Sequence, residues 1–236
     1  MFVIPMAGSS SRFFEAGFLL PKYQLLIGNE TVFEWSVRSF EKYFETDKFV
    51  FIYRDIYHTD EFIKSKLREL GIRDFDLVCL DNETEGQAHT VYEGIKNLET
   101  NDSVYIFNID SKIKNFAKPD WADKCEGYLE VFKGQGNHWS FVLANDEDDV
   151  IQTSEKERIS NLCSDGLYFF DQLSTFKALF LDAKKNKQTT KNEYYIAPLY
   201  NSLIQEGKTV RYHLIGKEDI LFCGTPNEYQ KIINNM

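Results

Sequence analysis

The sequence is poor in the residues that define several classes of protein. Only four of its 236 residues are cysteine, and none forms a CxxC pair, so a disulfide-dense scaffold is excluded. Thirteen glycines and five prolines are too few for a collagen-like or low-complexity chain. No apolar run approaches the ~18–20 residues of a membrane span, and the N-terminal MFVIPM lacks the basic flank of a secretory signal. We therefore expect a cytoplasmic protein with reduced, buried thiols.

Positive charge is also scarce. The chain has 27 Lys and Arg against 37 Asp and Glu, a formal net charge of -10. General nucleic-acid binding and polybasic membrane binding both need broad positive fields, so we expect neither partner. What is plentiful is apolar surface, with 43% hydrophobic and 15% aromatic residues, enough for one sizeable core. Any anionic substrate must be bound where a few cations reverse the local sign.

Hydrophobic patterning predicts an α/β fold. In the first half, apolar runs at 2–6, 48–53, 74–80 and 103–109 alternate with helix-period segments at 31–43, 60–70 and 86–98. Such alternation is typical of a parallel sheet covered on both faces. After residue 110 short strands follow at 127–132, 139–144, 150–152 and 167–170, then helices at 171–183 and 194–206, strands at 210–215 and 219–223, and a last helix from 225. We expect the second half to supply a small strand-rich lid over a mainly parallel central sheet.

Two polar positions follow predicted strands and are candidates for chemistry. The first strand leads into Ala7-Gly8-Ser9-Ser10-Ser11-Arg12, with Lys22 further on. Backbone N–H groups and hydroxyls of such a loop can cradle phosphate oxygens, but the same residues also suit a solvated loop. Asp110 ends the strand at 103–109, where a carboxylate either binds Mg²⁺ together with substrate phosphates or caps the following turn. The residues alone leave these alternatives open.

Six short motifs occur in a fixed order along the chain. They are Ala7-Gly8-x-Ser10-Ser11-Arg12 with Pro21-Lys22, Thr84-Glu85-Gly86-Gln87-Ala88, Asn108-Ile109-Asp110, Glu155-Lys156, Gly166-Leu167-Tyr168-Phe169-Phe170 and Gly224-Thr225-Pro226-Asn227-Glu228. Together they resemble the sugar nucleotidyltransferases, also called nucleoside-diphosphate-sugar pyrophosphorylases, over residues 2 to about 230. The stretch 127–223 is most similar to members encoded with bacterial capsule or surface-polysaccharide genes.

The resemblance implies a Rossmann-like, three-layer nucleotidyltransferase fold of the GT-A-like kind, with residues 1–236 forming one domain. About 1–115 would bind the nucleotide and about 116–236 the acceptor. The implied reaction joins a nucleoside triphosphate to a phosphorylated small molecule, by default a sugar phosphate, with Mg²⁺ as cofactor and pyrophosphate as leaving group. The product would be an activated precursor of capsule or surface polysaccharide. Whether the chain is a monomer or a homodimer is left open.

The family's roles carry over by resemblance to sixteen positions. Arg12, Lys22 and Lys156 are the expected catalytic residues, because they would bind the phosphates and stabilise charge at the α-phosphorus. Asp110 is the expected metal ligand. The residues expected to bind the nucleotide are Ala7, Gly8, Ser9, Ser10, Ser11, Asp81, Gly86 and Gln87. Those expected to bind the acceptor are Asn108, Glu155, Gly166 and Glu193.

Three positions set this chain apart from the family pattern or bear on specificity. Ser10 replaces the second glycine of the first loop, and Phe222 stands where a second metal carboxylate is usual. Asp81 occupies the place of a base-reading glutamine of thymidylyl members. A carboxylate only accepts hydrogen bonds, which suits the N4 amino group of cytosine, so we expect a preference for CTP.

Other functions remain as alternatives. The acceptor is a sugar phosphate in the default case, or a non-sugar phosphate such as a phosphorylated amino acid or alditol. A glycosyltransferase on the related fold would usually carry Asp-x-Asp where this chain has Asn108-Ile109-Asp110. A non-catalytic nucleotide-sensing homologue is suggested by the lost carboxylate at Phe222, whereas the retained cations Arg12, Lys22 and Lys156 favour an enzyme.

Overall fold

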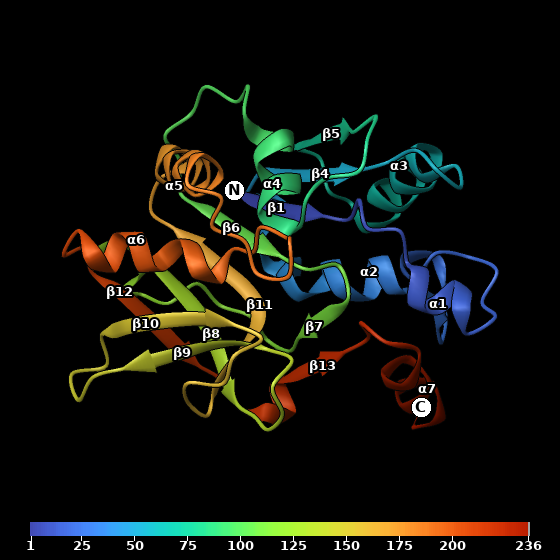
Figure 1. Ribbon diagram of the computed structural model, residues 1–236. Helices are drawn as coiled ribbons and strands as arrows, with labels where there is room; N and C mark the ends of the chain where they lie inside the picture. Colours follow the sequence, from blue (N-terminus) through green and yellow to red (C-terminus); the bar gives the residue numbers. More distant parts are fainter. Residues whose placement is uncertain (236) are drawn as a thin grey trace.

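The computed structural model describes residues 1–235, and its centre is a nine-stranded mixed sheet (Figure 1). Four strands of the first half run parallel in the order β6 (Val104–Phe107), β1 (Phe2–Pro5), β4 (Phe49–Tyr53) and β5 (Phe75–Cys79). Their register is continuous, with Phe2 opposite both Phe49 and Tyr105. The α/β class and the parallel first half are therefore confirmed.

Helices cover both faces of the sheet, because successive strand residues point to opposite sides. Phe2 and Ile4 of β1 belong to the core cluster under α2 (Val32–Val37) and α3 (Thr59–Leu70), whereas Val3 belongs to the cluster under α4 (Gln87–Ile95), α5 (Leu173–Lys185) and α6 (Tyr200–Gln205). Thr31 forms a capping box with Glu34 at the start of α2. Three layers result, as expected.

The strands of the second half extend the central sheet instead of forming a separate lid. β11 (Leu162–Phe170) pairs antiparallel with β6, with Leu167 opposite Phe107. β11 in turn pairs with β8 (Gly127–Lys133) and β9 (Ser140–Ala144), and β10 (Val150–Glu155) and β12 (Val210–Leu214) complete the sheet. β6 would otherwise be an edge with unpaired backbone groups, and β11 removes that edge. The expectation of a separate strand-rich lid was therefore wrong, because these strands belong to the central sheet.

Smaller elements surround the sheet. They are α1 (Ser11–Glu15), η1 (Lys22–Gln24), β2 (Leu26–Ile27), β3 (Glu30–Thr31), η2 (Arg38–Tyr43), β7 (Ser111–Ile113), η3 (Ala122–Lys124), η4 (Ala197–Leu199), η5 (Lys217–Asp219), β13 (Ile220–Phe222) and α7 (Pro226–Asn234). β13 pairs with β7, and Tyr229 of α7 packs edge-on against Phe13 of α1. The two ends of the chain thus share a small hydrophobic cluster beside the main core.

Two sequence-based expectations need correction. The helix expected at 194–206 begins only at Ala197, because residues 193–195 run extended across the start of α4. Cys163 and Cys223 are buried, as their apolar neighbours predict, and Cys125 is buried as well, but Cys79 is exposed at the end of the edge strand β5 although it also follows an apolar run. All four thiols are free.

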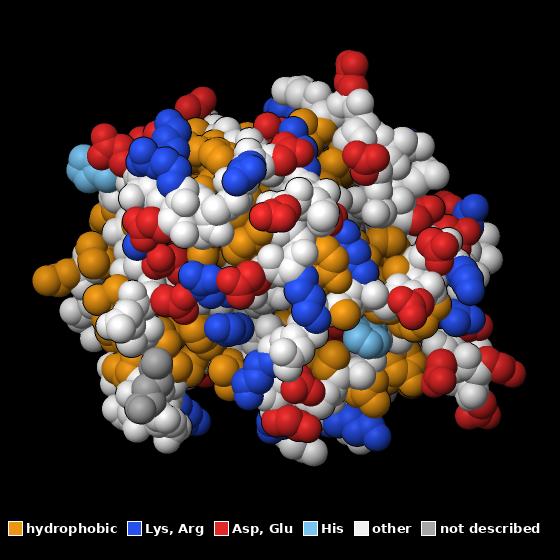
Figure 2. Space-filling model, turned by 180° about the vertical axis from the view of Figure 1, so that it is seen from behind, with side chains coloured by type: hydrophobic (Ala, Val, Ile, Leu, Met, Phe, Trp, Pro, Cys, Tyr) orange, Lys and Arg blue, Asp and Glu red, His pale blue; other side chains and the backbone are white. Residues whose placement is uncertain are grey.

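The surface carries charges of both signs. Figure 2 shows Lys and Arg interspersed with Asp and Glu over the back of the molecule, with hydrophobic side chains between them. Among residues 1–235, every helix is too short or too polar to cross a bilayer.

Candidate active site

A cavity of about 460 Å³ opens at the carboxyl ends of β1, β4 and β6. Polar side chains gather there because the carboxyl edge of a parallel sheet presents the residues that follow each strand. Its lining includes ten expected site residues, namely Ala7, Gly8, Ser9, Arg12, Lys22, Gly86, Gln87, Asn108, Asp110 and Glu193. The fold thus brings together motifs separated by up to about 190 positions in the sequence.

Lys22 and Asp110 form the ion pair at the floor of this cavity. Lys22 Nζ lies 2.5 Å from Asp110 Oδ2, and both side chains are about one-fifth exposed. Burial raises the pKa of the Asp110 carboxyl, but the positive charges of Lys22 and Arg12 outweigh it and leave the pKa below its usual value. Asp110 is therefore ionised at neutral pH, and Cys223 N–H holds its backbone carbonyl at 2.7 Å.

The loop after β1 combines cavity-lining and structural residues. Ala7, Gly8, Ser9 and Arg12 line the cavity. Ser10 has the left-handed φ of 55° that favours glycine, and its hydroxyl accepts a 3.2 Å hydrogen bond from Lys22 N–H. Ser10 and Ser11 line neither this cavity nor a second cavity that adjoins it, and Ser11 begins α1.

Gly86 allows an extended segment to dock at the start of α4. Its φ is +111°, and a Cβ there would lie 2.7 Å from both N and O of Tyr194. Tyr194 N–H donates to the Glu85 carbonyl at 2.7 Å, and its carbonyl accepts from Ala88 N–H at 2.9 Å. These bonds require close approach of two backbones, which only glycine permits at this φ.

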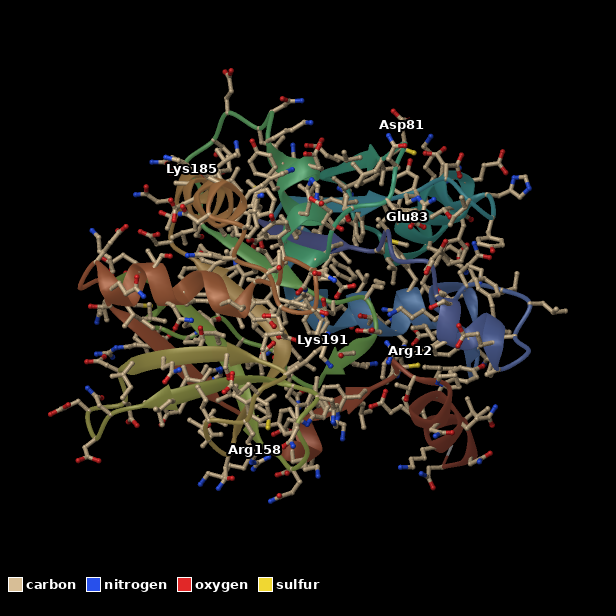
Figure 3. All side chains as sticks on the ribbon, viewed as in Figure 1. Arg12, Asp81, Glu83, Arg158, Lys185 and Lys191 are labelled. Carbon is tan, nitrogen blue, oxygen red and sulfur yellow. The ribbon has the colours of Figure 1, made fainter. Side chains whose placement is uncertain are left out.

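A tight turn presents the residues on either side of Tyr194 to the site. Lys191 and Asn192 both have positive φ, and Thr190 and Glu193 exchange backbone hydrogen bonds of 3.0 Å, as in a two-residue hairpin turn. Lys191 lies near the middle of the molecule in Figure 3. This turn places Glu193 in the lining of the first cavity. Tyr195 lines the first cavity and also the second cavity that adjoins it.

The expected base-reading residue Asp81 does not line the cavity. Asp81 and Glu83 are both exposed, but only Glu83 lines the cavity, together with Arg54, with which it forms a 2.7 Å ion pair. In the view of Figure 3, Asp81 lies at the outer margin of this loop and Glu83 nearer to Arg12. The loop therefore offers a different carboxylate from the one that the sequence suggested.

A second cavity of about 310 Å³ adjoins the first. Five residues line both, namely Arg12, Gln87, Asn108, Asp110 and Tyr195. The second cavity adds Glu155, Lys156 and Gly166, which were expected to contact the acceptor and its phosphate, whereas the fourth acceptor residue, Glu193, lies on the side of the first. The two cavities therefore adjoin at Asp110.

Lys156 lines the second cavity, whereas Lys22 lines the first. The Lys156 ammonium lies 4.2 Å from the centre of the Tyr195 ring and donates to the Tyr195 hydroxyl, which in turn donates to Glu193. Neighbouring Glu155 is buried and accepts from the Ser140 hydroxyl, and burial raises the pKa of the Glu155 carboxyl. These contacts hold the Lys156 ammonium beside Tyr195, which lines both cavities.

Gly166 and Asn108 are in close contact across the strands β11 and β6. Gly166 has a φ of +100°, and a Cβ there would lie 2.6 Å from Asn108 Nδ2. Asn108 Oδ1 accepts from the Gln87 side-chain amide, so the three residues form one network between the cavities. Glycine at 166 is required by this packing as well as by its backbone angle.

Phe222 belongs to an aromatic wall of the second cavity. Its ring lies 4.7 Å from that of Trp139 and 5.3 Å from that of Phe132. Where the family usually has a metal-binding carboxylate, this chain therefore has an aromatic side chain packed against two others. Residues 1–235 contain no group of three His, Cys, Asp or Glu side chains placed to hold a metal. Asp110 still fits Mg²⁺, because this ion keeps several waters and binds one or two carboxylates plus substrate phosphates.

Several lining residues were not among the expected site residues. Arg54 directly follows β4 and lines the first cavity. Asp110 was identified from the sequence because it follows a strand, and the same criterion could have identified Arg54. Ser140 of β9, Asp165 of β11, Tyr195 and Glu228 of α7 line the second cavity, and none of them directly follows a strand of the parallel half. Contacts of this kind depend on the tertiary structure.

Solved structures resemble this chain over its full length. The nucleoside-diphosphate-sugar pyrophosphorylase from Vibrio cholerae RC9 is 43% identical, with a TM-score of 0.96, over 99% of this chain and 100% of that one. A Bacillus anthracis protein described as a glucose-1-phosphate thymidylyltransferase, solved with sucrose, is 17% identical (TM-score 0.77; 99% and 94% covered), and a UDP-glucose pyrophosphorylase bound to UDP-glucose is 16% identical (TM-score 0.73; 99% and 97% covered).

Neither a scan of protein-family models nor a comparison with curated proteins finds a match. The two distant structures show a shared fold, and the identity and full coverage of the Vibrio cholerae protein show more than the fold. This chain belongs to the nucleoside-diphosphate-sugar pyrophosphorylase family of nucleotidyltransferases.

Proposed function

We propose that the protein transfers a cytidylyl group from CTP to a phosphorylated small molecule, in the simplest case a sugar phosphate, and releases pyrophosphate. The product is an activated precursor for capsule or another surface polysaccharide, made in the cytoplasm. The nucleotide binds in the first cavity and the acceptor in the second. The observation that carries the proposal is that Arg12 and Asp110 line both cavities, while Lys22 lines the first and Lys156 the second.

The arrangement of cations suits an in-line displacement at phosphorus. A phosphate oxygen of the acceptor attacks the α-phosphorus of the triphosphate, the bond from that phosphorus to the β-phosphate oxygen breaks, and pyrophosphate leaves. Lys156 holds the acceptor phosphate, Arg12 the β- and γ-phosphates, and Lys22 the charge near the α-phosphorus. No protein nucleophile is needed, because positioning and charge neutralisation supply the catalysis.

Magnesium fits this scheme through Asp110. The ionised carboxylate would share the ion with the triphosphate, and the ion would supply neutralisation of the phosphate charge. The Lys22 ammonium contacts Asp110 Oδ2 and helps to keep the carboxyl ionised.

Base preference is proposed to depend on Glu83. Its carboxylate lines the nucleotide cavity beside Arg54, and an acceptor-only group there suits the amino group of cytosine better than the carbonyl of uracil or thymine. Asp81, which does not line the cavity, serves as the matched control in the same loop.

A nucleotide panel tests the proposal. The protein is incubated with Mg²⁺, with CTP, UTP, dTTP, GTP or ATP, and with a pool of sugar phosphates, phosphorylated amino acids and alditol phosphates, and pyrophosphate is quantified. Release with CTP alone is the expected result, and deconvolution of the pool identifies the acceptor. Release with dTTP or UTP in preference to CTP would contradict the base assignment while retaining the transferase.

Two alternatives predict different outcomes of the same panel. A glycosyltransferase would consume nucleotide sugars and release no pyrophosphate from triphosphates, and Arg12 and Lys22 would have no triphosphate to bind. A nucleotide-sensing homologue would show a rise in melting temperature with a triphosphate and no turnover with any acceptor. The position of Lys156 in the second cavity favours the transferase, because a sensor of nucleotides has no use for a second phosphate site.

A further inference from the structure

The side chain of Tyr195 lies between a cation and a carboxylate at the junction of the two cavities. The Lys156 ammonium lies 4.2 Å from the centre of the Tyr195 ring and donates to the Tyr195 hydroxyl. That hydroxyl donates its own proton to Glu193 Oε2. Both functions of the hydroxyl, donor and acceptor, are thus used, and both partners are charged groups of the site.

The backbone of Lys156 is fixed from another direction. Lys156 has a left-handed φ of 57°, which is uncommon for a residue with a side chain. Its N–H donates to the Trp139 carbonyl at 2.9 Å, and the Trp139 indole N–H donates to the Gln135 carbonyl at 2.9 Å. Backbone strain of this kind persists only where neighbouring groups impose it, and it is typical of functional sites. The Lys156 side chain therefore begins at a fixed point, and Tyr195 contacts its other end.

The segment that carries Tyr195 is itself anchored. Tyr194 N–H donates to the Glu85 carbonyl at 2.7 Å, and the Tyr194 carbonyl accepts from Ala88 N–H at 2.9 Å. The Tyr194 side chain is buried, with its ring 5.7 Å from that of Phe180. Tyr195 is therefore a support of fixed position, and it is attached to the start of α4 on the side of the nucleotide cavity.

Two carboxylates lie near the Lys156 ammonium, and neither forms a short ion pair with it. Glu155 Oε1 is 4.0 Å away, and the other oxygen of Glu155 accepts from the Ser140 hydroxyl. Among residues 1–235, Glu193 makes no ion pair with Lys156 within 4.0 Å, and its contact passes through the Tyr195 hydroxyl. A neutral hydroxyl takes one ammonium proton without cancelling the charge, so two protons remain for a phosphate.

We propose that Tyr195 positions Lys156 for the acceptor phosphate, because its hydroxyl orients the ammonium and keeps Glu193 from pairing with it directly. The proposal rests on the proposed function in assigning the acceptor phosphate to Lys156. A lysine loses rotamer freedom when it binds a ligand, and a support that fixes it beforehand lowers that cost. Tyr195 is a positioning residue, since it acts through Lys156.

Two variants separate the two effects of the hydroxyl. Tyr195→Phe keeps the ring beside the ammonium, removes the hydroxyl and lets Glu193 approach Lys156. The double variant Tyr195→Phe with Glu193→Gln also removes the competing negative charge. Phosphate binding at Lys156 should therefore weaken in the single variant and recover in part in the double variant.

Tyr212→Phe is the matched control. It also removes a tyrosine hydroxyl that donates to a carboxylate, in this case Asp148 at 2.6 Å. Tyr212 lines neither of the two site cavities. Phosphate binding at Lys156 should therefore be the same in this variant as in the wild type.

Inorganic phosphate is the probe, and the acetylation rate of each lysine is the readout. The protein reacts with an amine-acetylating reagent at increasing phosphate concentrations, and mass spectrometry quantifies Lys156 and Lys22 separately. The phosphate concentration that halves the rate at Lys156 should rise about fivefold in Tyr195→Phe. In the double variant the rise should be smaller, and Lys22 should respond equally in all variants. Loss of the fold would instead expose lysines throughout the chain.

Three results would count against the proposal. Equal protection of Lys156 in the wild type and in Tyr195→Phe would overturn it and leave the proposed function intact. A double variant that binds phosphate no better than Tyr195→Phe would overturn the claim that the hydroxyl keeps Glu193 away. No protection of Lys156 in the wild type would overturn the proposal together with the acceptor-phosphate role of Lys156.

Kinetics with glucose 1-phosphate, Mg²⁺ and CTP add a readout that a merely structural role would not give. Tyr195→Phe should raise the KM for glucose 1-phosphate about fivefold and change the KM for CTP less than about twofold. An equal rise in both KM values would overturn the positioning of Lys156 by Tyr195. Absence of turnover in the wild type would overturn glucose 1-phosphate as acceptor, and the acetylation data would still decide the role of Tyr195.

Discussion

The ammonium of Lys22 and the carboxylate of Asp110 meet at 2.5 Å, joining the segment after β1 to the end of β6. The contact spans 88 positions in sequence and lies where the two cavities adjoin. It holds the expected metal ligand ionised and fixes the lysine that is proposed to act at the α-phosphorus.

Lys22→Ala should lower turnover by orders of magnitude and destabilise the fold by about 1–3 kcal/mol, since Asp110 is left without its partner. Steady-state kinetics and urea unfolding measure the two effects. Lys48→Ala removes an ion pair with Asp76 away from the site and is the control. Equal turnover in the two variants would contradict the role of Lys22.

Asp110→Asn should raise the Mg²⁺ concentration needed for turnover, because an amide is a weaker ligand than a carboxylate. The variant also tests linkage. The pKa of the Asp110 carboxyl is lower in the folded protein than its ordinary value, so the ionised carboxyl stabilises the fold at pH values above that ordinary value. This stabilisation is lost as the pH falls through the folded-state pKa. Urea unfolding between pH 3 and 7 should show a shallower acid loss in Asp110→Asn, and an unchanged profile would count against the assignment.

Ser10→Gly should be more stable than Ser10→Ala by about 1 kcal/mol. Both variants lose the hydroxyl that accepts from Lys22 N–H, but only glycine adopts the observed φ of 55° without strain. The difference in free energy of unfolding between the two variants, measured with denaturant, gives the cost of placing a non-glycine residue at this φ. Equal stabilities would show that the loop adopts another conformation in solution.

Gly166→Ala should destabilise the fold by about 2 kcal/mol or more and lower turnover, because the added Cβ meets Asn108 at 2.6 Å and φ is +100°. Gly207→Ala is the matched control, with φ +72° and open space around the Cβ position. It should show a smaller loss of stability and normal kinetics. If both variants lose turnover equally, the contact with Asn108 is not what matters.

Glu83→Gln should shift the nucleotide preference from CTP toward UTP or dTTP, because an amide also donates a hydrogen bond to a base carbonyl. Asp81→Gln should leave the preference unchanged. Ratios of kcat/KM for the three nucleotides measure both variants. The opposite pattern would return the base contact to Asp81 and imply that the loop rearranges when the nucleotide binds.

Much of the fold could be predicted from the sequence because its signals are local. Apolar runs identified β1, β4, β5 and β6, and Gly71 with φ +76° ends α3 as expected. Carboxyl-end positions of parallel strands predicted that Arg12, Lys22 and Asp110 would converge, and they do. Periodicity and strand-end chemistry determine such features without knowledge of distant contacts.

The tertiary structure decided what depends on distant pairing. β11 joins the sheet at β6, residues 193–195 run extended because they bond to the backbone near Gly86, and Glu83 lines the cavity instead of Asp81. The sequence by itself determined the family, the parallel half of the sheet and the charged residues at its strand ends, because short motifs and local apolar runs are enough to identify them. The tertiary structure decided which groups meet, because burial and charge balance depend on neighbours that are remote along the chain.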